Sequence, residues 1–332
     1  MQKLLTIVVP VYKVEPYINK CLDSCVLDDE KLMNQLEVII VNDGTPDNSA
    51  EMSREYVKRY PKTFRQIDKE NGGHGSAWNV GLKEATGKYL RFLDSDDWLT
   101  NLDKLMSKLQ SCEADVVLTN YQRYYVQRQE YVVYNSAISI DKEQPISKEL
   151  LHTLPNGYID LNFWSGTYKT SILQPLYPLM AERVMYDDSI LSFAPLIHGR
   201  TIIGYDIVLY NYLIGREGQS MDAKVQQKNA KSYVVCLQRE EDLLASIKSV
   251  TIPADLRECI NEVVSQYAHF VFSYFAFLPY GESKRQMRRV VKVYPWDKQA
   301  QPKIYKRFAK FPFPLFYYLE KCRTMYLQLK NK

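Results

Sequence analysis

Residues 89–100 read YLRFLDSDDWLT, an apolar run that leads straight into three aspartates. The run predicts a buried strand, and like charges crowded at its end repel one another unless a cation lies among them. Asp94 and Asp96 are two positions apart, so both carboxylates point to one side if the chain stays extended. Carboxylate oxygens are ligands that Mg²⁺ or Mn²⁺ prefers, and such a metal can bridge a diphosphate. Alternatively, Asp97 or Asn101 only caps the following helix.

Around this stretch, strand and helix patterns alternate. Short apolar runs predict strands over residues 4–12, 36–44, 88–93 and 114–120, and the alternation adds a strand at 64–68. Helical spacing predicts helices over residues 14–26, 48–60, 77–86 and 101–110. The third of these helices follows a glycine-rich turn, and Asn48 or Ser49 is placed to cap the second. The alternation predicts an α/β fold with a mainly parallel sheet flanked by helices, in which ligands bind beyond the carboxyl ends of the strands.

The glycine-rich segment NGGHGSAWNVG, residues 71–81, fits neither common phosphate loop. Trp78 stands where a GxGxxG motif needs its last glycine, and the chain has no P-loop lysine motif. The segment therefore predicts a turn whose backbone N–H groups approach an anion or a sugar at a helix N-terminus. The alternative is an ordinary turn with Ser76 as the helix cap. His74 is isolated in the sequence, which is more typical of a packed or solvated ring than of a catalyst.

Composition limits the class of protein. The chain has 332 residues, of which 46% are hydrophobic, as expected for a globular protein with one large and one smaller unit. Its six cysteines are scattered without metal-ligand spacing, and we expect them to be reduced. The N-terminal apolar run is interrupted by Pro10 and lacks a cleavage site, so we expect a cytoplasmic protein. No apolar run is long enough to predict a membrane span.

Charge is distributed unevenly. Residues 281–332 carry 14 basic and three acidic side chains, a net charge of +11, which leaves −7 for residues 1–280 of a chain whose total is +4. The basic residues alternate with aromatic ones, which predicts contact with an anionic membrane surface. A solvated helical face with some core aromatics is the alternative. The acidic body and the absence of a recognised motif argue against a nucleic-acid partner.

Four blocks of sequence, in order and spacing, resemble the family 2 inverting glycosyltransferases with the GT-A fold, over roughly residues 1–220. The blocks are IVVPVYKVEPYINKCLDS (7–24), VIIVNDGTPDNS (38–49), KENGGHGSAWNVGLKEATGKYLRFLDSDDW (69–98) and VMYDDSILSFAPL (184–196). The resemblance implies a nucleotide-diphosphosugar donor, commonly a UDP-sugar, a Mn²⁺ or Mg²⁺ cofactor, and transfer to a hydroxyl with inversion at the anomeric carbon.

The resemblance also implies roles for single residues. The implied donor-binding residues are Pro10, Val11, Tyr12, Asp43, Asn71, Gly72, Gly73, Asp94, Ser95 and Arg216. Asp94 and Asp96 correspond to the metal ligands. Two residues depart from the family's pattern. An amide, Asn42, replaces an acidic residue before Asp43, which weakens the expected preference for uracil. Trp78 replaces an arginine common in the helix after the glycine turn, which removes a phosphate contact, so the metal and other donors must meet the charge of the diphosphate. Arg216 corresponds to a basic loop residue over the donor, or is simply a solvated arginine.

Inverting transfer requires one base opposite the leaving group. In ERVMYDDSIL, Asp188 occupies the position of the family's base, and Asp187 is placed with the acceptor. The alternative is that both aspartates only cap a helix over residues 189–197. Trp164 lies in a segment resembling the acceptor region, where it would stack on a sugar ring unless it packs in the core.

We expect a catalytic domain over residues 1–222, with a nucleotide half (1–100) and an acceptor half (101–222), followed by a helical, basic and aromatic region over residues 223–332. Helical patterns at 231–247 and 256–278 predict packing on the catalytic domain or on a partner. The acceptor is expected to be a saccharide or lipid-linked saccharide of a bacterial surface polysaccharide or glycoconjugate, reached at the inner face of the plasma membrane. The oligomeric state is not predicted.

Two other classes of protein use a similar fold. A nucleotidyltransferase needs a glycine-rich, basic loop after the first strand, where this chain has PVYKVEPY, residues 10–17. A non-catalytic carbohydrate- or nucleotide-sugar-binding protein of the same fold is the remaining alternative. Retention of Asp43, Asp94, Asp96 and Asp188 favours an enzyme.

Overall fold

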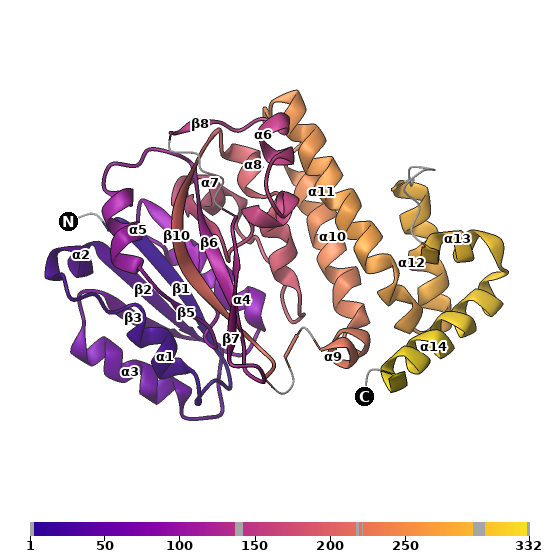
Figure 1. Cartoon of the computed structure of the whole chain (residues 1–332), viewed down its shortest axis with the longest axis horizontal. Coiled ribbons are helices and arrows are strands. Elements are labelled where there is room, and N and C mark those ends of the chain that lie inside the picture. Colours follow the sequence, from indigo (N-terminus) through magenta and orange to yellow (C-terminus); the bar gives the residue numbers. More distant parts are fainter. Residues whose placement is uncertain (1–2, 137–141, 217–218, 221, 295–302, 331–332) are drawn as a thin grey trace.

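The computed structural model describes residues 3–136, 142–216, 219–220, 222–294 and 303–330. Its described residues form one mixed sheet in the order β3-β2-β1-β4-β9-β6-β10-β5, flanked by helices (Figure 1). The strands are β1 Leu5–Val11, β2 Leu36–Asn42, β3 Phe64–Asp68, β4 Tyr89–Phe92, β5 Trp98–Leu99, β6 Val116–Tyr125, β7 Glu130–Tyr134, β8 Gln144–Pro145, β9 Gly166–Lys169 and β10 Thr201–Ile214. The predicted α/β class is confirmed.

Strands β3, β2, β1 and β4 are parallel to one another and form the half of the sheet predicted from the N-terminal sequence. Every residue of β1, β2 and β4 is buried, which explains their near-continuous apolar sequences. The helices between them are α1 Ile18–Asp23, α2 Glu30–Gln35, α3 Ser49–Arg59 and α4 His74–Glu84. Because the strands are parallel, their carboxyl ends meet at one edge, and the polar residues after β1, β2 and β4 come together there.

The other half of the sheet is mixed. Strand β9 is inserted between β4 and β6 and is antiparallel to both, whereas the long β10 is parallel to β6. Helix α5, Leu102–Leu109, leads from β5 into β6, and smaller elements connect β8, β9 and β10. These are α6 Lys148–His152, η1 Gly157–Leu161, α7 Thr170–Leu173, η2 Gln174–Leu176, η3 Asp187–Ser192 and α8 Pro195–His198.

Three local predictions differ from the structure. The helix expected over 189–197 is a 3₁₀ helix, η3, followed by the short α8, because Pro195 lacks the N–H that would continue one helix. Asp47, rather than Asn48 or Ser49, stabilises the start of α3, since its Oδ1 accepts bonds from the Ser49 N–H (3.2 Å) and hydroxyl (2.6 Å). Helix α4 begins at His74, so Ser76 lies inside the helix and does not cap it.

Helices α9 to α14 lie on one side of the sheet-bearing part (Figure 1). They are α9 Ala223–Lys228, α10 Ala230–Ser246, α11 Ala254–Phe272, η4 Tyr274–Phe277, α12 Tyr280–Val293, α13 Lys303–Lys310 and α14 Phe313–Lys330. Helix α10 contacts η3, and α11 contacts α6 and α8, so both pack on the part that carries the sheet. None of the helices in the described ranges is long and apolar enough to cross a membrane.

Candidate active site

A cavity of about 600 Å³ opens at the carboxyl ends of β1, β2 and β4. All of the residues predicted for the site line it except Gly72. The predicted residues in its wall are Pro10, Val11, Tyr12, Asp43, Asn71, Gly73, Asp94, Ser95, Asp96, Trp164, Asp187, Asp188 and Arg216. Residues separated by up to 206 positions in the sequence therefore share one cavity.

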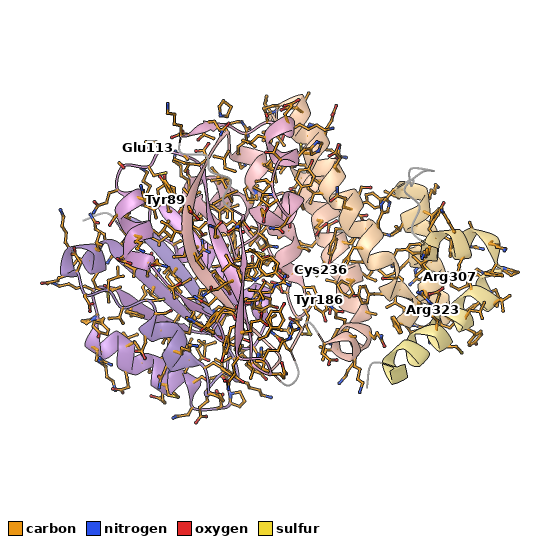
Figure 2. The ribbon with its side chains drawn as sticks, in the orientation of Figure 1. Tyr89, Glu113, Tyr186, Cys236, Arg307 and Arg323 are labelled. Carbon is orange, nitrogen blue, oxygen red and sulfur yellow. The ribbon has the colours of Figure 1, made fainter. Side chains whose placement is uncertain are left out.

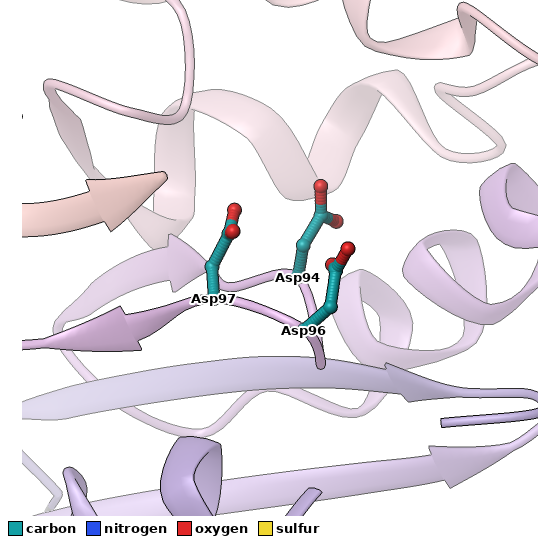
Figure 3. Close-up of side chains that lie close together, drawn as sticks. All are labelled: Asp94, Asp96 and Asp97. Atoms are coloured by element: carbon teal, nitrogen blue, oxygen red, sulfur yellow. The ribbon is translucent and has the colours of Figure 1, made fainter. Parts of the chain in front are cut away.

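The three aspartates after β4 have different roles in the fold. Figure 3 shows the three carboxylates directed to the same side of the loop, which includes the pair Asp94 and Asp96 expected to chelate a metal. Asp97 is buried and accepts hydrogen bonds from the Tyr210 hydroxyl (2.5 Å) and the Leu213 N–H (2.8 Å). Asp97 thus attaches the loop to β10 and does not cap α5. Although oxygens of all three aspartates lie within 4.8 Å of one another, Asp94 and Asp96 are the pair with hard oxygen donors facing the cavity, a set that suits Mg²⁺ or Mn²⁺.

Both of these carboxylates have a cationic partner. His74 Nε2 lies 2.8 Å from Asp94 Oδ1, and Arg216 Nε donates to Asp96 Oδ2. The Arg216 guanidinium also lies over the Tyr17 ring, 5.8 Å from its centroid. Arg216 therefore lies in the cavity wall as predicted, paired with an aspartate rather than solvated alone. A metal at Asp96 would share this carboxylate with Arg216 or displace it.

His74 is the main site residue that the sequence did not predict. Its Nδ1 lies 3.1 Å from Asp187 Oδ2, so the ring joins the loop after β4 to the start of η3. Burial acts to lower the pKa of His74, but the carboxylates of Asp187 and Asp94 outweigh it and raise the pKa well above its ordinary value. Because both ring nitrogens face carboxylates, the imidazolium form can donate to each. His74 packs on Trp78, which agrees with the predicted packed ring, but its contacts with two carboxylates were not predicted.

Asp43 holds the glycine-rich turn against the end of β2. Its Oδ1 and Oδ2 accept hydrogen bonds from the Gly72 and Gly73 N–H groups, each at 2.8 Å, and Lys69 Nζ lies 2.6 Å from Oδ1. Asn71 Nδ2 donates to the Asp43 carbonyl at 3.0 Å. Gly73 has a φ of +87°, a conformation that a residue with a Cβ adopts only under strain. These bonds fix the turn at the cavity wall. Gly72 holds the turn through its N–H group but does not itself line the cavity.

Asp188 differs from the other carboxylates of the cavity because no side chain of the described residues donates a hydrogen bond to it. Burial, followed by the nearby charges of Asp187 and Asp94, raises the pKa of Asp188 to about 7, against a smaller lowering effect of His74. The Asn162 side chain donates to the Asp188 carbonyl at 3.3 Å and so holds its backbone. A carboxylate with this pKa accepts a proton efficiently near neutral pH.

Trp78 and Trp164 contact different aromatic residues and have different roles. Trp78 is fully buried, with its ring stacked on Phe92 at 4.5 Å and lying 4.2 Å from the His74 ring, so it fills the core beneath the site. Trp164 instead lines the cavity and stacks on Tyr212 at 5.7 Å. Its indole N–H is buried without a hydrogen-bond partner in the described parts of the chain.

Buried Arg91 of β4 supports the backbone beside Trp164. Its guanidinium donates to the Trp164 carbonyl (2.5 Å), the Gly166 carbonyl (3.0 Å) and the Thr167 hydroxyl (2.8 Å). Burial lowers the pKa of Arg91 to about 10, which leaves it charged at neutral pH. The cation thus ties β4 to the segment before β9 and holds the cavity wall in place.

The C-terminal helices also support the site. Tyr186, which lines the cavity, stacks on Tyr233 of α10 at 4.5 Å. Figure 2 shows Tyr186 close to Cys236 of α10, whose thiol contacts the Met185 carbonyl at 3.4 Å. Glu240 accepts a hydrogen bond from the Ser189 hydroxyl at 2.8 Å, and burial raises the pKa of this glutamate well above its ordinary value. Helix α10 therefore positions the start of η3, which carries Asp188.

The model of the family described as glycosyl transferase family 2 matches residues 6–173, just over half of the chain. The chain belongs to glycosyl transferase family 2. Its matched region contains β1 to β4, the Asp94 to Asp97 loop and the glycine-rich turn.

This family 2 glycosyltransferase is similar to the glycosyltransferase EpsJ of Bacillus subtilis, with 30% identity over 216 residues, which cover 64% of this chain and 61% of EpsJ. Its fold is similar to that of Staphylococcus aureus TarS 1-349 in complex with UDP-GlcNAc (TM-score 0.53, 19% identity, 90% of this chain and 93% of TarS 1-349). It is also similar to the mannosyltransferase PcManGT of Pyrobaculum calidifontis in complex with GDP-Man and Mn²⁺ (TM-score 0.52, 15% identity, 97% and 85% of the two chains). These neighbours share the GT-A fold with the glycosyltransferase described here.

Proposed function

We propose that this family 2 glycosyltransferase moves a sugar from a nucleotide diphosphosugar, preferably a UDP-sugar, to an acceptor hydroxyl with inversion at the anomeric carbon. The observation that carries the proposal is that one cavity contains the chelating pair Asp94 and Asp96 together with Asp188. An inverting transferase needs these two functions, leaving-group stabilisation and proton removal, on opposite sides of the sugar.

On the donor side, Pro10, Val11 and Tyr12 at the end of β1 would contact the nucleotide base together with Asp43. Asn71, Gly73 and Ser95 would contact the rest of the donor. Asp94 and Asp96 would hold a Mn²⁺ or Mg²⁺ ion, which would act as a Lewis acid on the departing diphosphate. The complexes of TarS with UDP-GlcNAc and of PcManGT with GDP-Man and Mn²⁺ support this class of donor.

On the acceptor side, Asp188 would take the proton of the acceptor hydroxyl on a carboxylate oxygen. The freed oxygen would form a bond to the anomeric carbon as the bond from that carbon to the diphosphate oxygen breaks. The contact with His74 would hold the Asp187 carboxylate in position beside the acceptor. The Trp164 ring would stack on a saccharide of the acceptor. The pKa of Asp188, about 7, supports its role as the base.

We place the catalytic unit in residues 1–222, with the donor bound mainly by residues 1–100 and the acceptor mainly by residues 101–222. Residues 223–332 would form a supporting helical region that associates with an anionic membrane from the cytoplasmic side. The acceptor would be a saccharide or lipid-linked saccharide in the assembly of a bacterial surface polysaccharide or glycoconjugate. The net charge of +11 over residues 281–332 supports the membrane association.

The test is a panel of nucleotide sugars with Mn²⁺ or Mg²⁺, scored by release of nucleoside diphosphate with and without saccharide acceptors. We expect one donor to give acceptor-dependent release that chelator abolishes. Thermal stabilisation by each donor is measured in parallel, because ligand binding raises the unfolding midpoint. Binding of a donor without turnover, across a broad set of acceptors, would favour the non-catalytic sugar-nucleotide-binding protein instead.

A further inference from the structure

Helix α14 has two apolar faces in the part whose side chains are described, residues 313–323, and one of the two is exposed. Phe313, Phe316 and Tyr317 point inward and are buried, and the Tyr317 hydroxyl donates to the Leu278 carbonyl at 2.8 Å. On the other face, Leu315, Tyr318 and Leu319 are 48%, 61% and 44% exposed, and Cys322 is exposed as well. We call Leu315, Tyr318, Leu319 and Cys322 the outer stripe of α14. Their spacing of three, four and seven residues places them on one side of the helix.

Basic side chains border the outer stripe. Lys321 and Arg323 lie on either side of Cys322 in the sequence of α14, and Lys321 Nζ lies over the Tyr317 ring, 4.3 Å from its centroid. An apolar stripe with cations at its margins is typical of a helix that lies in the plane of a membrane interface. The surrounding residues 281–332 have a net charge of +11, so their charge complements an anionic lipid surface.

A basic pocket lies beside the stripe. It has a volume of about 510 Å³ and lies between α9, η4, α13 and α14. Lys303, Arg307 and Arg323 contribute its cations, and Ile304 and Phe277 contribute apolar wall. Figure 2 shows Arg307 and Arg323 near one another in this part of the molecule. Both arginines contact Glu320, but Arg307 Nη2 is buried and has no hydrogen-bond partner among the described residues.

We infer that the outer stripe of α14 docks into the interface of an anionic phospholipid bilayer and that the basic pocket receives a lipid headgroup phosphate. The inference deepens the proposed membrane association by naming the surface that makes the contact. It does not depend on the transfer reaction, because the stripe belongs to α14 and the cavity with Asp188 is built on β1, β2, β4 and η3.

Charge argues for a bilayer rather than a second copy of this chain. A twofold-symmetric dimer through α14 would bring the same surface of both copies together. Two regions of net charge +11 would then face one another, and like-charge juxtaposition disfavours association. An anionic bilayer instead attracts this region and repels the remaining residues, 1–280, whose net charge is −7.

The inference is tested by sedimenting the full chain with vesicles of phosphatidylcholine alone or with added phosphatidylglycerol. We expect binding to the anionic vesicles, loss of that binding in high salt, and at least about a tenfold weaker affinity for Tyr318→Ser/Leu319→Ser. Lys303→Gln/Arg323→Gln should weaken binding to anionic vesicles as well. The matched control is Tyr131→Ser/Val133→Ser on β7, where the two side chains are similarly exposed, 49% and 48%. Unfolding midpoints verify that each variant folds.

Equal affinity of the stripe variant and the β7 control, or no binding of the parent chain to anionic vesicles, would overturn the inference. A dimer in light scattering that the Tyr318→Ser/Leu319→Ser change dissociates would identify the stripe as a contact between copies and would overturn it too. Asp188→Asn should bind vesicles like the parent chain. Failure of the transfer reaction is thereby separated from failure of membrane docking.

Discussion

Two parts of the cavity wall hold their carboxylates in different ways: the loop after β4, with Asp94 and Asp96, and the start of η3, with Asp188. Asp94 and Asp96, after β4, each have a cationic partner, His74 and Arg216 respectively. Asp188, at the start of η3, receives no side-chain hydrogen bond from the described residues, and its pKa is raised to about 7. The fold therefore places a cation in direct contact with Asp94 and with Asp96 but not with Asp188, although burial raises the pKa of Asp96 as well.

The difference corresponds to two kinds of chemistry. Asp94 and Asp96 are suited to hold a metal ion, because the ion would take the place of the His74 and Arg216 cations beside their carboxylates. A carboxylate that is desolvated near other negative charges binds a proton more tightly, which a general base requires.

The largest effect is expected for Asp188→Asn. The amide cannot take a proton from the acceptor, so we expect kcat to fall about 10³-fold while donor binding stays within about twofold. Steady-state kinetics and donor titration measure both quantities. Asp103→Asn, an exposed aspartate in the first turn of α5, is the matched control and should keep parental activity. Near-normal kcat in Asp188→Asn would refute the assignment of the base.

Asp96→Ala tests the other carboxylate set. Without one of the two metal ligands, we expect about a 10²-fold loss of activity and no metal-dependent thermal stabilisation by the donor. The readout is the unfolding midpoint with donor, in the presence of Mg²⁺ and in the presence of chelator. If chelator has no effect on donor binding in the parent chain, the metal assignment fails.

The pH dependence of kcat/KM follows from the raised pKa of Asp188. The base must be deprotonated, so activity should fall as the pH drops through about 7, by about tenfold between pH 8 and pH 6. Rates measured with subsaturating donor across this range give the acidic limb. An acidic limb near pH 4, the ordinary range of an aspartate, would contradict the environment described for Asp188.

His74→Gln should move that acidic limb to higher pH. The positive charge of His74 acts to lower the pKa of Asp188, and its removal leaves Asp187 and Asp94 as the charged neighbours. We expect a severalfold loss of kcat/KM at pH 7 that is partly recovered at pH 8.5. A uniform loss at every pH would indicate a purely structural role for the ring.

The smallest effect concerns stability. Because the pKa of Asp188 is higher in the folded than in the unfolded chain, its protonated form stabilises the fold at low pH, and this contribution is lost as the pH rises through about 7. Asp188→Asn, which is neutral at every pH, should therefore be more stable than the parent at pH 8.5, by about 2 kcal/mol, and equally stable at pH 3.5. Denaturant unfolding at the two pH values measures the difference, and an equal effect at both would exclude a charge-based origin.

Local sequence was sufficient for most of the parallel half of the fold. The strands β1, β2, β3 and β4 lie where strands were predicted. Strands β1 and β2 are short, β-branched runs followed by turn residues, and β4 is a short, buried run. The mixed half was predicted less completely. Strand β9 joins the sheet antiparallel between β4 and β6, and no local pattern encodes where a strand inserts.

For the site, the order and spacing of the four blocks predicted residues that the cavity then brought together, from Pro10 to Arg216. His74 was not predicted because its partners Asp94 and Asp187 are 20 and 113 residues away in the sequence. The supporting contact from Glu240 to Ser189 was not predicted for the same reason. A histidine inside a glycine-rich turn next to a predicted phosphate site was the one available signal.

By itself, the sequence determined the alternation of strands and helices, the acidic loop after β4, the family and the basic C-terminal region, because propensity, periodicity and charge are properties of neighbouring residues. Only the tertiary structure decided which carboxylates are paired with cations and which one is left to bind a proton. That outcome depends on burial and on distances between atoms far apart along the chain, which folding alone sets.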